Sequence, residues 1–428
     1  MEVKPVFLQM TTSENNNKYY NCFPNGDDTF TVKYGRVGGH ETVISYPMSK
    51  WSSQINSKIK KGYKDISELM RDVIEDSKIK SFDNRDDFSV IDNISVREII
   101  KRLWDFANKV VQDAYKVQAS VVTKAMIDKA QEIIDMLAVN YRIMDSEEFN
   151  SKLLILFNTI PRQMKDVRDY LSEYWHDNEV QLNMFKRIID REQDTLNAMA
   201  GQVYIKKNNS SQLGDSSSNS SQLSILDKMG ITMEDATKDD VIKIKKAMGD
   251  ASSKFYKAWR VTNKETEEKF QKYTRENNIG NHKLCVHGSR NQNWFNILKT
   301  GLKIRPSCAI YTGSLLGDAL YFSNPDKYHG GVTKSIGYTS LGGYWTHDYQ
   351  KCGFLAFFET ALGKSYIINT HDNKYHNMNL IKLKGLDKDA WSLWLKGSGH
   401  SGWNTVINDE ITVYNENQCT IRYLVEIR

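Results

Sequence analysis

A polar tract divides this chain into two parts that cannot share one continuous core. Residues 208–224 read NNSSQLGDSSSNSSQLS and contain almost no apolar side chains. Such a segment cannot bury enough surface to offset the conformational entropy that folding removes. The 428 residues also exceed what a single hydrophobic core usually organises. We therefore expect separate domains on the two sides of a linker at residues 205–224.

The composition is that of a soluble, intracellular protein. Hydrophobic residues make up 40% and charged residues 26% of the chain, so neither global disorder nor a membrane protein is indicated. The N-terminus lacks the basic start and long apolar run of a secretory signal. A net charge of +5 is too small to indicate a nucleic-acid partner by itself. We expect no membrane partner and a cytoplasmic or nuclear location.

Cysteine usage supports a reducing compartment and argues against a structural metal site. No CxxC pair occurs, and the odd number of cysteines cannot be fully paired within one chain. A structural zinc site would need four Cys or His ligands in two close pairs. We therefore expect no bound metal. The five scattered cysteines are Cys22, Cys285, Cys308, Cys352 and Cys419.

The first 85 residues have the pattern of a small antiparallel β-meander followed by a helix. Short runs rich in Val, Thr, Tyr and Phe alternate with turns that contain Asn, Gly and Asp, which is typical of hairpins. In the helical segment that follows, Ile55 and Ile59 share a face. We place a first domain at residues 1–85. The four predicted strands are VFLQMT, NKYYNCF, TFTVKYG and ETVISY.

The proline distribution allows long helices in the middle of the chain. Residues 48–160 and 162–305 contain no proline, the strongest helix breaker. From residue 95 apolar residues recur at steps of three and four, and Ser95 with Glu98 is predicted to form a capping box. We expect a helical bundle at residues 95–204, with Pro161 closing one of its helices. Residues 225–428 are predicted to form a mixed α/β domain, with a helix near 264–277.

Two glycine motifs of the last domain do not fit nucleotide-binding folds. Gly397-Ser-Gly399-His-Ser-Gly402 matches GxGxxG, but too few residues follow it to complete a βαβ unit. Gly363-Lys-Ser lacks the upstream glycine of a phosphate-binding loop, because position 358 is Phe. Both interpretations are rejected.

Four other segments combine polar groups with aromatic strands. His287 ends an apolar strand, Tyr321 lies in an aromatic one, Tyr338 closes a Lys-Ser-x-x-Tyr segment, and Glu410 begins a terminal strand. Each segment alone is more typical of structure, since aromatic residues on strands usually belong to a core. Together, in this order, they resemble the catalytic domain of the poly(ADP-ribose) polymerases over residues 225–428.

This resemblance implies an antiparallel α/β fold with a cleft for NAD⁺ as substrate, and a catalytic trio formed by His287, Tyr321 and Glu410. Gly288 has no Cβ, so a nicotinamide carboxamide could approach its main chain. Ser335 would bond the same carboxamide, and tyrosines would stack on both sides of the ring. His287 and Ser289 would contact the adenosine ribose. The residues expected to bind NAD⁺ are His287, Gly288, Ser289, Asn293, Tyr321, Ser335 and Tyr338.

Glu410 is the residue expected to carry the chemistry. Cleavage of the bond between nicotinamide and ribose builds positive charge on the ribose, as in glycoside hydrolysis, and a nearby carboxylate stabilises it. The same carboxylate can orient or deprotonate an incoming hydroxyl. Asp409 is the alternative, although alternation along a strand directs it to the opposite face. Because the glutamate is present, chain elongation is chemically permitted. Asn408, Lys303 and Asp318 differ from the DNA-dependent members of the family.

The N-terminal segment KYGRVGG, residues 33–39, and the lysine-rich helix after it resemble the WGR domain of family members that DNA breaks activate. The resemblance implies a sequence-independent grip on broken duplex DNA. Two alternatives remain: a lysine run is often a solvated helix face, and Arg36 could contact another domain instead. The bundle resembles the family's regulatory domain and is expected to cover the cleft until DNA loosens it. The implied DNA-binding residues are Tyr34, Arg36, Trp51, Lys58 and Lys61.

The predicted function is that of a poly(ADP-ribose) polymerase stimulated by DNA strand breaks, which modifies protein acceptors including itself. Two alternatives are kept. The first is a mono-ADP-ribosyltransferase, and the second is a DNA-end-binding scaffold with an inactive transferase domain. The complete His-Tyr-Glu trio argues against the second alternative.

Overall fold

The computed structural model describes residues 3–70, 86–115, 122–210, 223–304, 314–325, 331–343, 349–399 and 405–428. The chain forms two compact units. The N-terminal unit comprises Met1–Phe82 and Asn108–Tyr204, and the C-terminal unit comprises Asp83–Ala107 and Ile205–Arg428. Most of the predicted linker at 205–224 lies outside the described residues, and its first part, up to Ser210, is helical.

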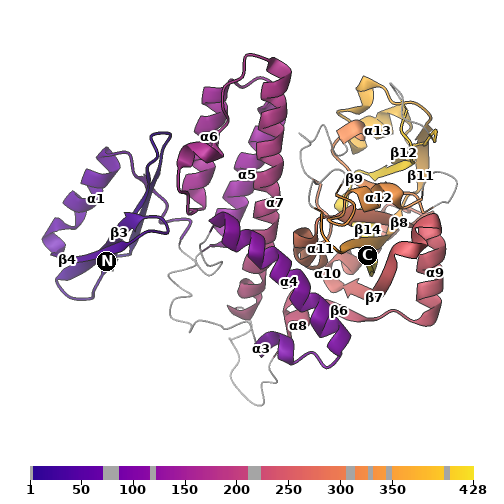
Figure 1. Ribbon diagram of the computed structural model, residues 1–428, viewed down its shortest axis with the longest axis horizontal. Coiled ribbons are helices and arrows are strands. Elements are labelled where there is room, and N and C mark those ends of the chain that lie inside the picture. Colours follow the sequence, from indigo (N-terminus) through magenta and orange to yellow (C-terminus); the bar gives the residue numbers. More distant parts are fainter. Residues whose placement is uncertain are drawn as a thin grey trace. The chain divides into compact units, whose positions relative to one another are not determined.

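The N-terminal unit begins with a five-stranded antiparallel sheet of order β4-β3-β2-β1-β5 (Figure 1). The predicted meander is confirmed, and a short fifth strand is added. Helix α1 (Trp51–Lys60) places Trp51 and Ile55 against the buried face of the sheet, which centres on Leu8 and Phe30. The strands are β1 (Val6–Thr11), β2 (Asn17–Pro24), β3 (Thr29–Arg36), β4 (Glu41–Pro47) and β5 (Lys64–Asp65).

Three long helices form most of the rest of this unit: α5 (Lys124–Asn140), α6 (Ser146–Thr159) and α7 (Asn178–Ser210), the last up to Tyr204. Helix α6 ends before Pro161, as predicted, because a residue that precedes proline is pushed out of the helical conformation. Phe149 and Phe185 stack at 3.9 Å and join α6 to α7. Arg162 and Glu192 form an ion pair with a 2.6 Å contact and are almost fully buried.

Helix α4 (Ile94–Tyr115), which follows the short α3 (Asp86–Ser89), does not begin as the sequence predicted. The side chain of Asn93 accepts a hydrogen bond from the Val96 amide at 3.1 Å. Ser95 Oγ instead donates to Asp235 at 2.7 Å and accepts from Trp259 Nε1 at 2.9 Å. The predicted Ser95–Glu98 capping box is therefore wrong, because tertiary contacts use the Ser95 hydroxyl.

The first part of α4 belongs to the C-terminal unit, although the sequence assigned it to a bundle starting at residue 95. Arg102 pairs with Glu426, a carboxylate that is 1% exposed, and its guanidinium lies 5.5 Å from the Phe354 ring. Trp104 meets Phe295 edge-on with ring centroids 5.1 Å apart. These contacts tie residues 83–107 to the fold that contains the candidate active site.

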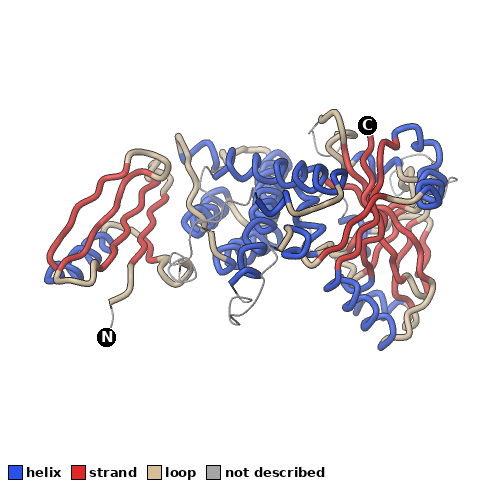
Figure 2. The backbone as a smooth tube through the Cα atoms, turned by 90° about the horizontal axis from the view of Figure 1, so that it is seen from below, coloured by secondary structure: helices blue, strands red, loops and turns tan. Residues whose placement is uncertain are grey.

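The C-terminal unit is built on a twisted nine-stranded sheet of order β11-β12-β13-β9-β8-β10-β14-β7-β6 (Figure 2). Its neighbouring strands are antiparallel except for β11 and β12, which are parallel, so the predicted antiparallel sheet is correct for all but one pair. The strands are β6 (Ile231–Asp235), β7 (Phe255–Asn263), β8 (His282–Ser289), β9 (Leu320–Ser323), β10 (Gly353–Ala361), β11 (Lys364–Ile368), β12 (Ala390–Leu395), β13 (Glu410–Val413) and β14 (Cys419–Ile427).

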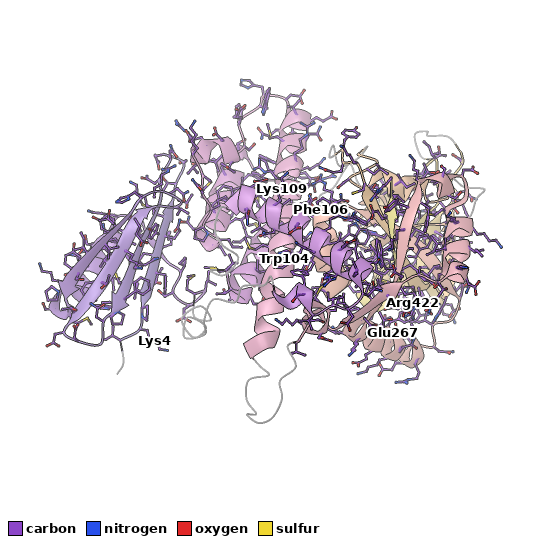
Figure 3. The ribbon with its side chains drawn as sticks, turned by 60° about the horizontal axis from the view of Figure 1, so that its bottom comes forward. Lys4, Trp104, Phe106, Lys109, Glu267 and Arg422 are labelled. Carbon is purple, nitrogen blue, oxygen red and sulfur yellow. The ribbon has the colours of Figure 1, made fainter. Side chains whose placement is uncertain are left out.

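Short helices surround this sheet, and α10 is fixed to it by charge. Arg422 of β14 contacts Glu267 of α10 at 2.6 Å and Glu359 of β10 at 2.7 Å (Figure 3). The α-helices are α8 (Ile225–Met229), α9 (Lys238–Met248), α10 (Lys264–Glu276), α11 (Trp294–Thr300), α12 (Thr333–Gly337) and α13 (Leu380–Leu386). The 3-10 helices used below are η5 (Asn291–Asn293), η6 (Ser314–Leu316) and η8 (Asn373–Tyr375).

Two hydrophobic clusters support the middle of the sheet. The first contains Val286, Val332 and Ile336 and joins α12 to β8, β10 and β14. The second contains Leu316, Leu393 and Tyr414 and joins η6 and α13 to β12 and β13. Strand β9 runs between β13 and β8. In the described part of the chain, no helix has the length and apolar character needed to cross a membrane.

Candidate active site

A pocket is enclosed by β8, β9, α12 and the start of β13. The three members of the predicted trio come from three different strands and line this single pocket, as do three more predicted residues. The lining residues are His287, Gly288, Tyr321, Phe322, Ser323, Lys334, Ser335, Tyr338 and Glu410.

Glu410 is the first residue of β13, where the register places it opposite Ser323 of β9 and Leu395 of β12. Its side chain is only 6% exposed and forms an ion pair with Lys334 of α12. The second carboxylate oxygen, Oε2, is buried and has no hydrogen-bond partner among the described residues. Since buried polar atoms are normally satisfied, this oxygen is ready to accept a hydrogen bond from a ligand hydroxyl.

Asp409 points away from the pocket, as the strand alternation predicted. Its carboxylate accepts hydrogen bonds from Trp394 Nε1 at 2.8 Å, the Gly397 amide at 2.7 Å and Asn324 Nδ2 at 3.0 Å. It therefore anchors the chain after β12 rather than facing a substrate. Gly397 and Gly399 lie in this anchored loop, which explains their presence without a nucleotide-binding motif.

Lys334 is the charged pocket residue that the sequence did not single out. It lies on α12, and burial lowers the pKa of its ammonium group to about 7. In the sequence, the position of Lys334 directly before Ser335 is the one indication of a place in the pocket. An isolated lysine is otherwise expected on the protein surface. Paired with Glu410, it places a titratable cation beside the carboxylate.

His287 orients Tyr321 through the backbone. Its Nδ1 lies 3.0 Å from the Tyr321 carbonyl oxygen, which can only accept, so Nδ1 carries a hydrogen. Burial lowers the pKa of His287, which favours the neutral ring and leaves Nε2 as an acceptor.

The Tyr321 hydroxyl is used within the protein. It donates to the Gly317 carbonyl at 2.7 Å and accepts from the Leu316 amide at 2.9 Å. Burial raises the pKa of this phenol, so it stays protonated. The ring, rather than the hydroxyl, is therefore what Tyr321 presents to the pocket.

Gly288 is required for a reason that the sequence did not reveal. A Cβ at this position would lie 1.9 Å from the carbonyl oxygen of Ser335, so α12 could not pack against β8. The Ser335 hydroxyl lies 3.0 Å from the Val286 carbonyl and 2.7 Å from Ser323 Oγ. To donate to a ligand, the hydroxyl would have to stop donating to one of these two oxygens. Ser323 itself was not predicted as a pocket residue.

The remaining predicted NAD⁺ contacts divide into two groups. Tyr338 lines the pocket together with Tyr321, and burial raises the pKa of its hydroxyl. Ser289 and Asn293 are not among the lining residues and instead contact each other, with Asn293 Nδ2 donating to Ser289 Oγ at 3.1 Å. They lie where β8 leads into η5 and α11, next to the pocket residues of β8.

Four of the five residues predicted to bind DNA, Tyr34, Arg36, Trp51 and Lys58, make structural contacts within the N-terminal unit. Lys58 lies 4.3 Å from the Tyr20 ring centroid and 5.8 Å from that of Tyr34, and burial lowers the pKa of its ammonium group. Trp51 packs edge-on against Phe30 at 5.0 Å. Neither side chain is a freely exposed contact, because both help to hold α1 on the sheet.

Arg36 bonds to the helical part of the same unit. Its guanidinium donates to the Asn15 side chain at 2.7 Å and to the Met164 and Lys165 carbonyls at 3.0 Å. These hydrogen bonds favour the alternative in which Arg36 contacts another part of the protein rather than DNA. Lys61, at the end of α1, is exposed.

Comparison with known proteins agrees with the pocket. The model of the poly(ADP-ribose) polymerase catalytic domain matches residues 238–428. A protein of Invertebrate iridescent virus 6 named putative poly [ADP-ribose] polymerase-like 100L is 32% identical over 176 residues, which span 41% of this chain and 87% of that protein. This chain belongs to the poly(ADP-ribose) polymerase family.

Further proteins that are similar to this chain differ in how much of their length the chain matches. Protein 101L of the same virus is 35% identical over 201 residues, 47% of this chain and 77% of that protein. Human poly [ADP-ribose] polymerase 2 is 30% identical over 182 residues, or 38% of this chain and 29% of that protein. Poly [ADP-ribose] polymerase 1 of Danio rerio is covered over only 16% of its length.

The C-terminal part of the chain is thus a poly(ADP-ribose) polymerase catalytic domain, an ADP-ribosyltransferase domain with NAD⁺ as its substrate. Within the described ranges, no group of three or more His, Cys, Asp or Glu side chains is arranged to hold a metal ion.

Proposed function

We propose that the chain is a poly(ADP-ribose) polymerase that transfers ADP-ribose from NAD⁺ to protein acceptors, including itself, and elongates the polymer. The observation that carries this proposal is the buried Glu410 carboxylate, which keeps one oxygen without a partner at the wall of the pocket. A ribose 2′-hydroxyl would satisfy that oxygen. The negative charge of Glu410 would stabilise the ribose more strongly here than in water, because the carboxylate is largely buried.

The nicotinamide end of NAD⁺ fits between Tyr321 and Tyr338, two aromatic side chains that line the same pocket. The main chain of Gly288, which lines the pocket, would offer both a donor and an acceptor to the carboxamide. Ser335 would add its hydroxyl after giving up a contact with Val286. Ser289, Asn293 and His287 Nε2 are the candidates for the adenosine side.

In the reaction, the bond between the nicotinamide nitrogen and the ribose breaks, and its electron pair leaves with nicotinamide. Positive charge develops on the ribose and is stabilised by Glu410. An acceptor hydroxyl or carboxylate then attacks the same carbon. When the acceptor is a hydroxyl of an existing ADP-ribose unit, Glu410 can take its proton, and the polymer grows.

We further propose that broken duplex DNA stimulates the enzyme through the N-terminal unit. Exposed lysines on α1 and on both sides of it support a phosphate-binding surface. The bonds from Arg36 to Met164 and Lys165 support the transmission of DNA binding from the sheet to the helices. In this proposal the helices restrict NAD⁺ access until the DNA-bound state is favoured. The exposed lysines are Lys50, Lys60, Lys61 and Lys64.

One experiment separates this function from its alternatives. The purified chain is incubated with labelled NAD⁺ and resolved on a denaturing gel, with and without a blunt DNA duplex. A smear of modified protein is the expected result. A single discrete band would instead identify a mono-ADP-ribosyltransferase, and the absence of label would identify a scaffold with an inactive domain.

A further inference from the structure

A short backbone segment, Leu315–Gly317, holds the hydroxyl of the pocket residue Tyr321, and we call it the support segment. It immediately precedes β9 and is bonded to the Tyr321 hydroxyl at two points, the Leu316 amide and the Gly317 carbonyl. Because the hydroxyl is at the far end of the phenol ring, the position of this segment determines where the Tyr321 ring lies in the pocket.

Two side chains outside the pocket lining hold the support segment from the other side. Tyr414, the residue after β13, donates from its hydroxyl to the Leu316 carbonyl at 2.8 Å. His371, which precedes η8, lies with Nε2 2.8 Å from the Leu315 carbonyl and can donate to it. Three consecutive peptide units are thus bonded by three side chains, and only one of these side chains reaches the pocket.

Close packing removes the remaining freedom of the support segment. Gly317 has φ +83°. A Cβ at this position would lie 2.1 Å from the carbonyl oxygen of Met378, so the backbone of Met378 lies directly against Gly317. Leu316 and Tyr414 are buried in the same hydrophobic cluster as Met378. The Tyr414 hydroxyl also accepts from Thr412 at 3.2 Å, and Thr412 is paired with Tyr321 across β13 and β9.

We propose that Tyr414 and His371 are positioning residues of the active site, which act through the support segment to hold the Tyr321 ring against the nicotinamide of NAD⁺. This inference rests on the proposed function, since it assumes that the pocket binds nicotinamide. Neither residue touches the reacting atoms. Their effect should therefore fall on the binding of the nicotinamide ring rather than on the subsequent chemistry.

The first test measures nicotinamide binding by calorimetry and NAD⁺ turnover for Tyr414→Phe. The variant keeps the ring but loses the donor to Leu316. We expect nicotinamide affinity to fall and KM for NAD⁺ to rise together by roughly fivefold to tenfold, the cost of about one hydrogen bond, with kcat nearly unchanged. A purely structural role would instead lower the active fraction, and hence kcat, without changing KM, which would overturn the proposal.

Tyr375→Phe is the matched control, because Tyr375 is buried in the same cluster but its hydroxyl lies beside Tyr366 and Lys374. It should leave nicotinamide affinity unchanged. His371 provides an independent pair should Tyr414→Phe fold poorly. His371→Ala removes the donor to Leu315, whereas His371→Gln keeps an N–H group. Restored affinity in the glutamine variant is expected, and equal loss in both variants would contradict the role assigned to His371.

A double-mutant cycle with Tyr321→Phe tests the route of the effect. Without its hydroxyl, the Tyr321 ring is no longer tied to the support segment, so adding Tyr414→Phe should have little further effect on nicotinamide binding. Equal losses in both backgrounds would show that Tyr414 does not act through Tyr321. If wild-type protein itself fails to bind nicotinamide, the proposed function fails; if only the cycle is additive, the positioning inference alone fails.

Discussion

Two adjacent carboxylates, Asp409 and Glu410, are assigned different roles by their hydrogen-bond partners. Asp409 bonds to Trp394, Gly397 and Asn324 of the protein, whereas Glu410 leaves one oxygen for a ligand. Sequence alternation alone predicted this difference in direction. It could not predict the partners, because Trp394, Gly397 and Asn324 are distant from β13 in the sequence or reached through a loop.

Substituting each carboxylate by its amide should separate the two roles. Glu410→Gln is expected to abolish polymer elongation and to lower the rate of nicotinamide release by roughly 10²- to 10³-fold, because the transition-state charge loses its partner. Labelled NAD⁺ gels and a nicotinamide assay measure both. Asp409→Asn should chiefly lower the melting temperature. Unchanged polymer in Glu410→Gln would refute the assigned role.

The Lys334–Glu410 pair predicts how activity depends on pH. The pKa of Lys334 is lowered to about 7, so the ammonium group is charged below pH 7 and loses its charge above it. While charged, it offsets the negative charge with which Glu410 would stabilise the positive charge on the ribose. We therefore expect kcat/KM to rise as pH increases from about 6 to 8, the range around this lowered pKa.

Lys334→Arg tests this pH dependence, because arginine stays charged over the whole range. The variant should show a flat profile at the low level of the wild type at pH 6. Nicotinamide binding serves as the control for an intact pocket. An inflection near neutral pH that persists in the variant would assign the titration to another group.

At the scale of elements, helix α4 shows where sequence patterns fail. Its 3.6-residue periodicity correctly predicted a helix, but periodicity does not reveal which partner a helix packs against. In the sequence, nothing shows which partners Arg102, Trp104 and Ser95 contact. In the structure, their side chains attach the first part of α4 to the rest of the C-terminal unit. A deletion that tests regulation by the helices should therefore start at residue 108 rather than 95.

Arg102→Met tests this assignment of α4. The substitution removes the Arg102 cation from Glu426, which is 1% exposed and, among the described residues, keeps an ion pair with Arg428. We expect the free energy of unfolding of the C-terminal unit to fall by about 1–3 kcal/mol. Thermal unfolding with and without nicotinamide reports on this unit. Lys101→Met, at an exposed neighbouring position of the same helix, is the control.

At the scale of the whole molecule, the order of the segments was predictable and many contacts were not. His287, Tyr321 and Glu410 could be assigned because their order and surroundings match one family. The sequence predicts Trp51 and Lys58 as DNA-binding residues. It does not show whether an aromatic or lysine side chain is exposed or packed against other residues. Only coordinates show that the Lys58 ammonium group lies over aromatic rings.

The proposed stimulation by DNA breaks predicts different effects for substitutions of two basic residues, one on DNA binding and one on activity. Lys61→Glu should weaken binding to a blunt duplex and make binding less sensitive to salt, because an exposed phosphate contact is lost. Arg36→Ala should leave DNA affinity within about twofold but reduce stimulation of activity, because its bonds go to Met164 and Lys165. Fluorescence anisotropy and NAD⁺ turnover measure these effects. Equal turnover with and without DNA in wild type would refute DNA stimulation.

The contact between Gly288 and the Ser335 carbonyl also bears on inhibitor design. Because even a methyl group at position 288 would collide with the backbone of α12, mutation cannot easily remodel this wall of the pocket. Compounds that imitate nicotinamide and form hydrogen bonds with the Gly288 main chain would depend on a contact that resistance mutations can hardly change. Escape variants should instead appear at side chains such as Tyr338.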